Sequence, residues 1–219
     1  MLSVNLKLMW VNKMNLFGRK EMKHSQAYTD FKAQPKATGR QRMEGYDPNL
    51  FDKITEQERS EVEKDIWNHF MNKNDADLAV LMPALKNYDG IAALKKKLAE
   101  FKIPSYGSAD IALALFEATE EEKYLDIIME NYRGLAVNTP IAVGLAGLAK
   151  KPGVYDLLVD IYLHDKDEAN RGQAIVGLLW RDGKLNSVND PMELFDKIDL
   201  IKAFKLDSEE AGTEHGENN

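Results

Sequence analysis

The chain has 219 residues, no cysteine and a formal net charge of −7, from 29 Lys and Arg against 36 Asp and Glu. The lack of cysteine excludes disulfides, thiolate metal sites and a cysteine nucleophile, and it is compatible with a reducing, cytoplasmic location. The acidic balance disfavours general binding to nucleic acid or to an anionic membrane. With 44% apolar and 30% charged residues, the composition is typical of a soluble, folded, mostly helical protein.

The first 46 residues form a basic arm ahead of an acidic body. They hold nine basic and three acidic residues, net +6, which leaves −13 for residues 47–219. Such an arm can dock on nucleic acid, on a lipid surface or on the acidic face of the chain itself, or it can stay solvated. We expect it to be partly disordered, with residues 1–13 either an upstream extension before a second start at Met14 or an ordinary flexible terminus. Within residues 1–13 the longest apolar run, Leu8–Val11, is too short for a signal peptide or a membrane span.

Residues 47–206 carry apolar side chains at helical spacing, and this predicts an all-α domain. The helical pattern is interrupted at residues 87–90, 104–107, 133–138, 152–153, 164–167 and 182–189. Thr55 with Glu58, and Thr119 with Glu122, have the spacing of capping boxes at helix starts. Residues 207–219 contain five acids and no large apolar residue, so we expect an acidic, disordered tail.

Comparing the chain with itself reveals an internal repeat. The pairs that match at an offset of 30 are Ile111 with Ile141, Ala112 with Ala142, Leu115 with Leu145, Asp126 with Asp156, Ile128 with Leu158 and Tyr132 with Tyr162. At an offset of 33, Gly144 recurs as Gly177. Because glycine is unfavourable inside a helix, these two positions predict a close approach between neighbouring helices. The pattern therefore favours stacked helix pairs.

The segment Asp167–Leu178 resembles the start of a HEAT-type repeat, in which an acid opens a helix that carries an arginine and then a face of small residues and leucine. The resemblance to HEAT/armadillo-like helical repeat proteins covers residues 75–206. It implies a right-handed alpha-alpha superhelix, a solenoid, of about four helix pairs within a repeat domain at 47–206. The implied units lie near 75–103, 105–134, 138–165 and 167–206, after a capping helix near 55–73. In families of this kind the second helices usually line a concave surface.

The second helices carry acidic residues at repeated positions. Asp126 and Glu130 lie one turn apart and away from the apolar stripe of their helix, and the next helix repeats them as Asp156 and Asp160. We therefore expect an acidic row, flanked by aromatic anchors, that binds a basic protein surface. The candidate partner-binding residues are Asp126, Glu130, Asp156, Asp160, Asp196, Tyr124, Tyr155 and Trp180. The alternative is structural: each Asp bonds to a helix end or to an arginine of the adjacent repeat, and each aromatic belongs to the core.

No sequence motif indicates catalysis, a metal or a cofactor. The four histidines stand far apart, and there is no Walker loop, G-x-S-x-G or dinucleotide glycine fingerprint. The leading interpretation is a non-enzymatic binding scaffold, and its size and acidity are also those of an immunity-type, toxin-neutralising protein. The alternative is a HEAT-like DNA-binding or DNA-glycosylase-like enzyme, with Trp180 and Asp182 in its site and Arg171 and Arg181 nearby. The acidic body lacks the basic groove that this alternative needs, so nucleic acid is an unlikely partner.

The last helix has more apolar residues than one packed face requires. They are Leu194, Phe195, Ile198, Leu200, Ile201 and Phe204. They either cap the array or form a contact between two copies, so the sequence leaves monomer and homodimer open.

Overall fold

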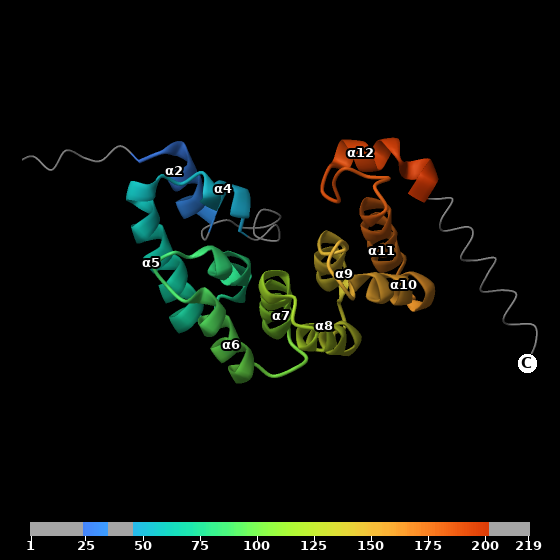
Figure 1. Cartoon of the computed structure of the whole chain (residues 1–219), viewed down its shortest axis with the longest axis horizontal. Coiled ribbons are helices and arrows are strands. Elements are labelled where there is room, and N and C mark those ends of the chain that lie inside the picture. The colour runs from blue at the N-terminus through green and yellow to red at the C-terminus, as the bar shows by residue number, and fades with distance from the viewer. Residues whose placement is uncertain (1–23, 35–45, 202–219) are drawn as a thin grey trace, which may run out of the picture.

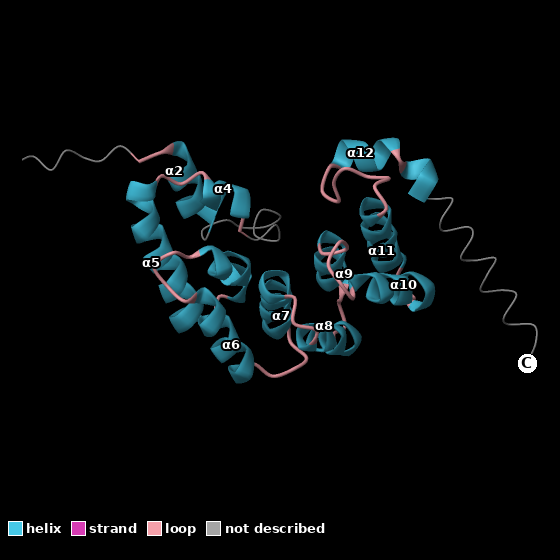
Figure 2. Ribbon diagram, in the orientation of Figure 1, coloured by secondary structure: helices cyan, strands magenta, loops and turns pink. Residues whose placement is uncertain are grey.

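The computed structural model describes residues 24–34 and 46–201. Every regular element in these ranges is a helix (Figure 2), which confirms the all-α prediction. The elements are α2 (Gln26–Ala33), α4 (Pro48–Asp52), α5 (Glu56–Lys73), the 3₁₀ helix η2 (Ala76–Ala84), α6 (Gly90–Glu100), α7 (Tyr106–Thr119), α8 (Lys123–Gly134), α9 (Thr139–Gly147), α10 (Val154–His164), α11 (Glu168–Arg181) and α12 (Pro191–Asp196). The predicted upstream extension, most of the basic arm and the acidic tail lie outside the described residues.

Successive helices pack into a curved array. Figure 1 shows an arc with α2 and α4 at one end and α12 at the other. Contacts run in order through η2, α7, α9 and α11, while α8 packs on α7 and α10 packs on α11. In Figure 1, α8 and α10 lie on the outer side of the bend, away from the open side between α4 and α12. The resemblance implied that the second helices line a concave surface, whereas the view in Figure 1 draws α8 and α10 on the outer side of the bend.

The repeated aliphatic positions form the core. Ile111, Ala112 and Leu115 of α7 and Ile141, Ala142 and Leu145 of α9 are all buried. Gly144 and Gly177 lie where these helices meet their neighbours. A Cβ on Gly144 would lie 2.7 Å from Cδ1 of Leu113 on α7, and one on Gly177 would lie 2.9 Å from Cα of Ala146 on α9. The close helix approach predicted from these two glycines is confirmed.

A partly buried polar network joins the ends of α8 and α10 to the starts of α9 and α11. The Tyr132 hydroxyl donates to Oδ2 of Asp165, and Nδ2 of Asn170 donates to the same oxygen at 3.2 Å and to Oδ1 of Asn138 at 2.5 Å. Burial opposes ionisation of Asp165, but hydrogen bonds from Tyr132, the Asp167 amide and Asn170 hold its pKa below the usual range. These bonds fix α8 and α10 relative to each other.

The described part of the basic arm docks on acidic residues of α5. The contacts are the amide and hydroxyl of Ser25 with Glu58 at 2.6 and 2.8 Å, the Tyr28 hydroxyl with Glu61 at 2.6 Å, and Lys32 with Asp65. A hydrogen bond from the Thr55 hydroxyl, together with those from Ser25, lowers the pKa of Glu58 to about 2. Residues 24–34 thus use the acidic face of the chain itself. Thr55 begins α5 as predicted, but its hydroxyl bonds to the Glu58 carboxylate and the expected capping box does not form.

The second predicted capping box is also wrong. Thr119 is the last residue of α7, where its hydroxyl donates to the Leu115 carbonyl at 2.7 Å. The left-handed Glu120, with φ of 55°, then ends the helix. The capping box of α7 lies at its start, between Ser105 and Ser108.

The first implied unit departs from a pair of α-helices. Its first element, η2, is a 3₁₀ helix that contains Pro83, which has no amide hydrogen to donate. Leu78, Leu81 and Met82 are nevertheless buried, so η2 supplies core contacts to α7.

Candidate protein-binding surface

The outward faces of α8 and α10 carry the predicted carboxylates. Packing of α8 buries Leu125, Ile128, Met129 and Tyr132. The opposite face leaves Asp126 and Glu130 exposed, and Asp156 is exposed at the matching place on α10. Within the described ranges, none of these three carboxylates has an ion pair or hydrogen bond. They are available to a partner.

A shallow cleft lies beside the two carboxylates of α8. It has a volume of about 440 Å³ and is lined by Asp126, Glu130, Met129, Arg133 and Pro104, among others. Two carboxylates and the apolar surface of Met129 and Pro104 can accept a long cationic side chain, whose stem is apolar and whose end is charged. The Arg133 guanidinium partly offsets the negative charge here.

Asp160 has a structural role. Its carboxylate lies 3.4 Å from Nη2 of Arg133 on α8 and 3.0 Å from Nδ1 of His164 on α10. This is the arginine of the adjacent helix pair that the structural alternative foresaw. Because its charge is paired, Asp160 contributes less to an acidic surface than Asp126, Glu130 and Asp156.

The three predicted aromatic anchors occupy different environments. Tyr124, in the first turn of α8, is only 3% exposed and belongs to the hydrophobic core, so it cannot be an anchor. Tyr155 is 43% exposed, and the Arg181 guanidinium lies 4.5 Å from its ring centre. Trp180 is half-buried against the core, with Nζ of Lys150 at 4.2 Å from its ring centre. Of the three predicted anchors, Tyr155 is therefore the most exposed.

Asp196 does not continue the row. It is exposed on α12, which lies beyond α11 from α10 at the end of the arc (Figure 1). The match between the Asp156 and Asp196 segments is a local likeness in sequence, because α12 is a short helix that does not stack beside α10. Asp126 and Glu130 lie one turn apart on α8, and Arg133 of α8 links that helix to Asp160 of α10, whereas Asp196 lies apart on α12.

An unexpected carboxyl lies in a second cavity, between η2 and the start of α7. The cavity has a volume of about 470 Å³, and Asp77, Asp110, Tyr106 and Lys73 are among its lining residues. Burial, and next to it the charge of Asp77, raises the pKa of Asp110 to about 7. No local pattern marks Asp110, because its burial depends on η2, more than 25 residues earlier in the chain.

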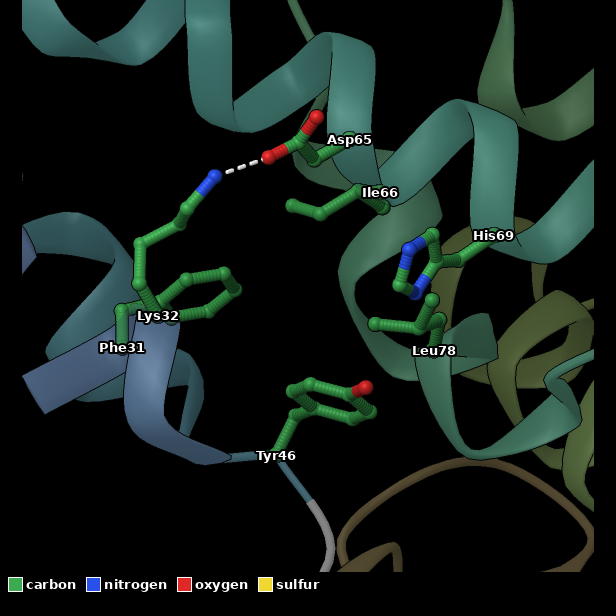
Figure 3. Close-up of a pocket in the computed structure, with 7 residues that line it drawn as sticks. All are labelled: Phe31, Lys32, Tyr46, Asp65, Ile66, His69 and Leu78. Carbon is green, nitrogen blue, oxygen red and sulfur yellow. Dashed lines mark hydrogen bonds and ion pairs between the residues drawn. The ribbon is translucent and has the colours of Figure 1, made fainter. Parts of the chain in front are cut away.

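A third cavity lies under α2. Figure 3 shows its walls, which include Phe31, Tyr46, Ile66 and Leu78, with His69 and the Lys32 and Asp65 ion pair at the side. The volume is about 250 Å³. Phe31, Ile66 and Leu78 are only 2 or 3% exposed, so the apolar wall is nearly closed to water. We assign this space to the packing of α2 on α5 and η2.

The described residues contain no group of three or more His, Asp or Glu side chains placed to hold a metal ion. None of the described helices combines the length and apolar character needed to cross a membrane. Comparisons of the chain with protein-family models, with curated proteins and with solved structures gave no match.

Proposed function

We propose that this protein is a non-enzymatic binding protein, a HEAT-like array of helix pairs that holds a basic protein partner against the outer face of α8 and α10. The observation that carries the proposal is the set of three exposed, unpaired carboxylates at repeated positions, Asp126, Glu130 and Asp156. Like charges held together repel in the free protein, and a basic partner relieves that repulsion. The network at Asp165 supports the proposal, because it keeps the two helices in a fixed relation for a partner.

The sign of the charge supports a particular kind of partner. A chain with net charge −7 steers basic proteins toward it and repels acidic ones. Cytotoxic nucleases are commonly basic, so we propose an immunity-type role, in a cytoplasmic setting, as the most specific form of the function. Tyr155 supplies an apolar contact on this surface. The Arg181 guanidinium covers one face of its ring, so a partner contacts the other face.

The DNA-glycosylase-like alternative finds less support in the geometry. Arg171 donates to the Asp165 carbonyl at 2.9 Å, and Arg181 covers the ring of Tyr155, so both arginines have partners within the chain. Trp180 packs against the core with Lys150 over its ring. Retention on DNA at about 0.1 M salt would favour this alternative over the protein-binding role.

Capture of partners from a lysate of the source organism tests the proposal. The bait is the full chain, as wild type, as Asp126→Lys with Asp156→Lys, and as the control Asp52→Lys with Glu117→Lys. The control makes the same change of net charge at exposed residues on α4 and α7. We expect a basic protein to be retained by wild type and by the control and lost from the Asp126 and Asp156 variant. Equal retention by all three would contradict the proposal, provided that circular dichroism shows equal helix content.

A further inference from the structure

The segment from Pro191 to Ile201 has an inward face that caps the array. Leu194 and Ile201 pack against a small cluster that includes Ile175 and Leu179 of α11. The capping role that the sequence left open is therefore filled by part of this segment.

The outward face of the same segment is apolar and is not covered by any other described residue. Met192 is 70% exposed and Phe195 72% exposed, and Ile198 and Leu200 are exposed as well. Among the large apolar side chains of the described ranges, Met192 and Phe195 are the most exposed. An aromatic and a thioether side chain side by side on a short helix are typical of contact sites.

The charged residues around this face restrict the kind of partner that can bind it. Residues 190–200 include Asp190, Glu193, Asp196 and Asp199 against Lys197, a net charge of −3. Asp190 accepts hydrogen bonds from the first turn of α12, and Glu193 accepts them from Asn186 and Ser187, so these two charges are held locally. Asp196 and Asp199 are exposed and have no partner within the described ranges.

Charge complementarity disfavours two occupants of this face, a second copy of the chain and an anionic membrane. A second copy of the chain would place one face of charge −3 against another, and like charges across an interface are unfavourable. An anionic membrane repels the face for the same reason. A basic segment with its own apolar stripe satisfies both the apolar and the charged groups.

We propose that the outward face of α12 and of the helical residues 198–201 after it binds a basic amphipathic helix, whose apolar side chains contact Met192, Phe195 and Ile198 and whose lysines or arginines pair with Asp196 and Asp199. Helix recognition in this mode uses apolar residues three or four apart on the bound helix. The source of the helix, a basic protein partner, rests on the proposed function, but the surface differs from that on α8 and α10.

A synthetic peptide tests this site without knowledge of the partner. The probe is a labelled 14-residue peptide of leucine and lysine with all leucines on one helical face, and the control peptide has the same composition in scrambled order. Binding to the full chain is measured by fluorescence anisotropy. The test variant is Met192→Ser with Phe195→Ser, and the matched control is Val137→Ser with Val143→Ser, two exposed valines elsewhere. All four positions are exposed, so each variant is expected to fold.

We expect the amphipathic peptide to bind wild type at least about tenfold more tightly than the Met192 and Phe195 variant, and to bind the valine control within about twofold of wild type. The scrambled peptide should bind all three proteins weakly and equally. Equal peptide affinity for wild type and the Met192 and Phe195 variant would overturn the proposal. So would a wild-type dimer that the same variant dissociates in sedimentation equilibrium, or binding to phosphatidylserine vesicles that the variant loses.

Peptide binding and partner capture together separate this inference from the function on which it rests. If Asp126→Lys with Asp156→Lys abolishes capture of the partner while peptide affinity is equal for wild type and the Met192 and Phe195 variant, the proposed function stands and the α12 site is overturned. If peptide binding depends on Met192 and Phe195 while capture is insensitive to Asp126 and Asp156, the α12 site stands and the role of the α8 and α10 surface fails.

Discussion

Two glycines on one helix give opposite predictions for the same substitution. Gly172 and Gly177 both lie in α11, but a Cβ on Gly172 meets no atom within 4 Å, whereas one on Gly177 would lie 2.9 Å from Cα of Ala146 and 3.0 Å from Cδ1 of Leu158. Alanine is favoured over glycine inside a helix by about 1 kcal/mol, so Gly172→Ala should stabilise the fold by about that amount. At Gly177 the same gain is opposed by an overpacking cost of about 1–3 kcal/mol, because the nearest atom belongs to the α9 backbone.

We therefore expect Gly177→Ala to be less stable than Gly172→Ala by about 2 kcal/mol, or roughly 4–8 °C in melting temperature for a chain of this length. Urea denaturation followed by circular dichroism at 222 nm measures the difference in free energy of unfolding. Equal m-values for the two variants would show that the unfolded states are comparable. If Gly177→Ala stabilises the protein as much as Gly172→Ala, α9 and α11 do not approach as closely as described, and the reasoning fails.

Two further predictions concern titrating carboxyls. The pKa of Asp110 is about 7 in the fold against 3.8 for an ordinary Asp, so the charged form is disfavoured by folding and wild-type stability falls as pH rises from about 4 to 7. Asp110→Asn should remove this fall and be more stable than wild type at pH 8, by up to about 4 kcal/mol in free energy of unfolding. The exposed control Asp156→Asn should show the same pH dependence of stability as wild type. An equal change in free energy of unfolding between pH 5 and pH 8 for wild type and Asp110→Asn would contradict the assignment. The pKa of Glu58 is lowered to about 2 from 4.5, so the hold of α5 on α2 is complete above pH 4.5 and is lost as pH falls toward 2. Hydrogen exchange should show α2 amides losing protection over that range in wild type, while Glu58→Gln should show weak protection throughout; full protection in Glu58→Gln would contradict it.

Local periodicity predicts the exposed carboxylates well. Asp126 and Asp156 lie on the sides of their helices opposite the buried Ile128 and Leu158. A helix that buries one apolar face exposes the residues on its opposite face, so periodicity alone predicts their exposure. Their repeat spacing also places the two helices in equivalent positions. The prediction from the two glycines is confirmed for a similar reason. Glycine inside a helix costs free energy, and at a repeated core position close packing against a neighbouring helix offsets that cost.

Features that depend on tertiary structure escape sequence reasoning. Tyr124 follows the charged stretch 120–123, but tertiary packing places it in the hydrophobic core. Thr119 has the spacing of a capping residue, yet the left-handed Glu120 makes it the end of the preceding helix. The pKa of Asp110 depends on a distant element, and the side of the arc taken by α8 and α10 depends on how all the helices stack.

Stopped-flow fluorescence gives the association rate between the purified chain and the captured partner, measured from about 0.05 to 0.5 M salt. We expect the rate to fall steeply with salt, and Asp126→Lys with Asp156→Lys to lower it at least about tenfold at low salt, while Asp52→Lys with Glu117→Lys should lower it much less. A rate that is independent of salt, or equal effects of the two charge reversals, would contradict the claim that the acidic face of α8 and α10 receives the partner.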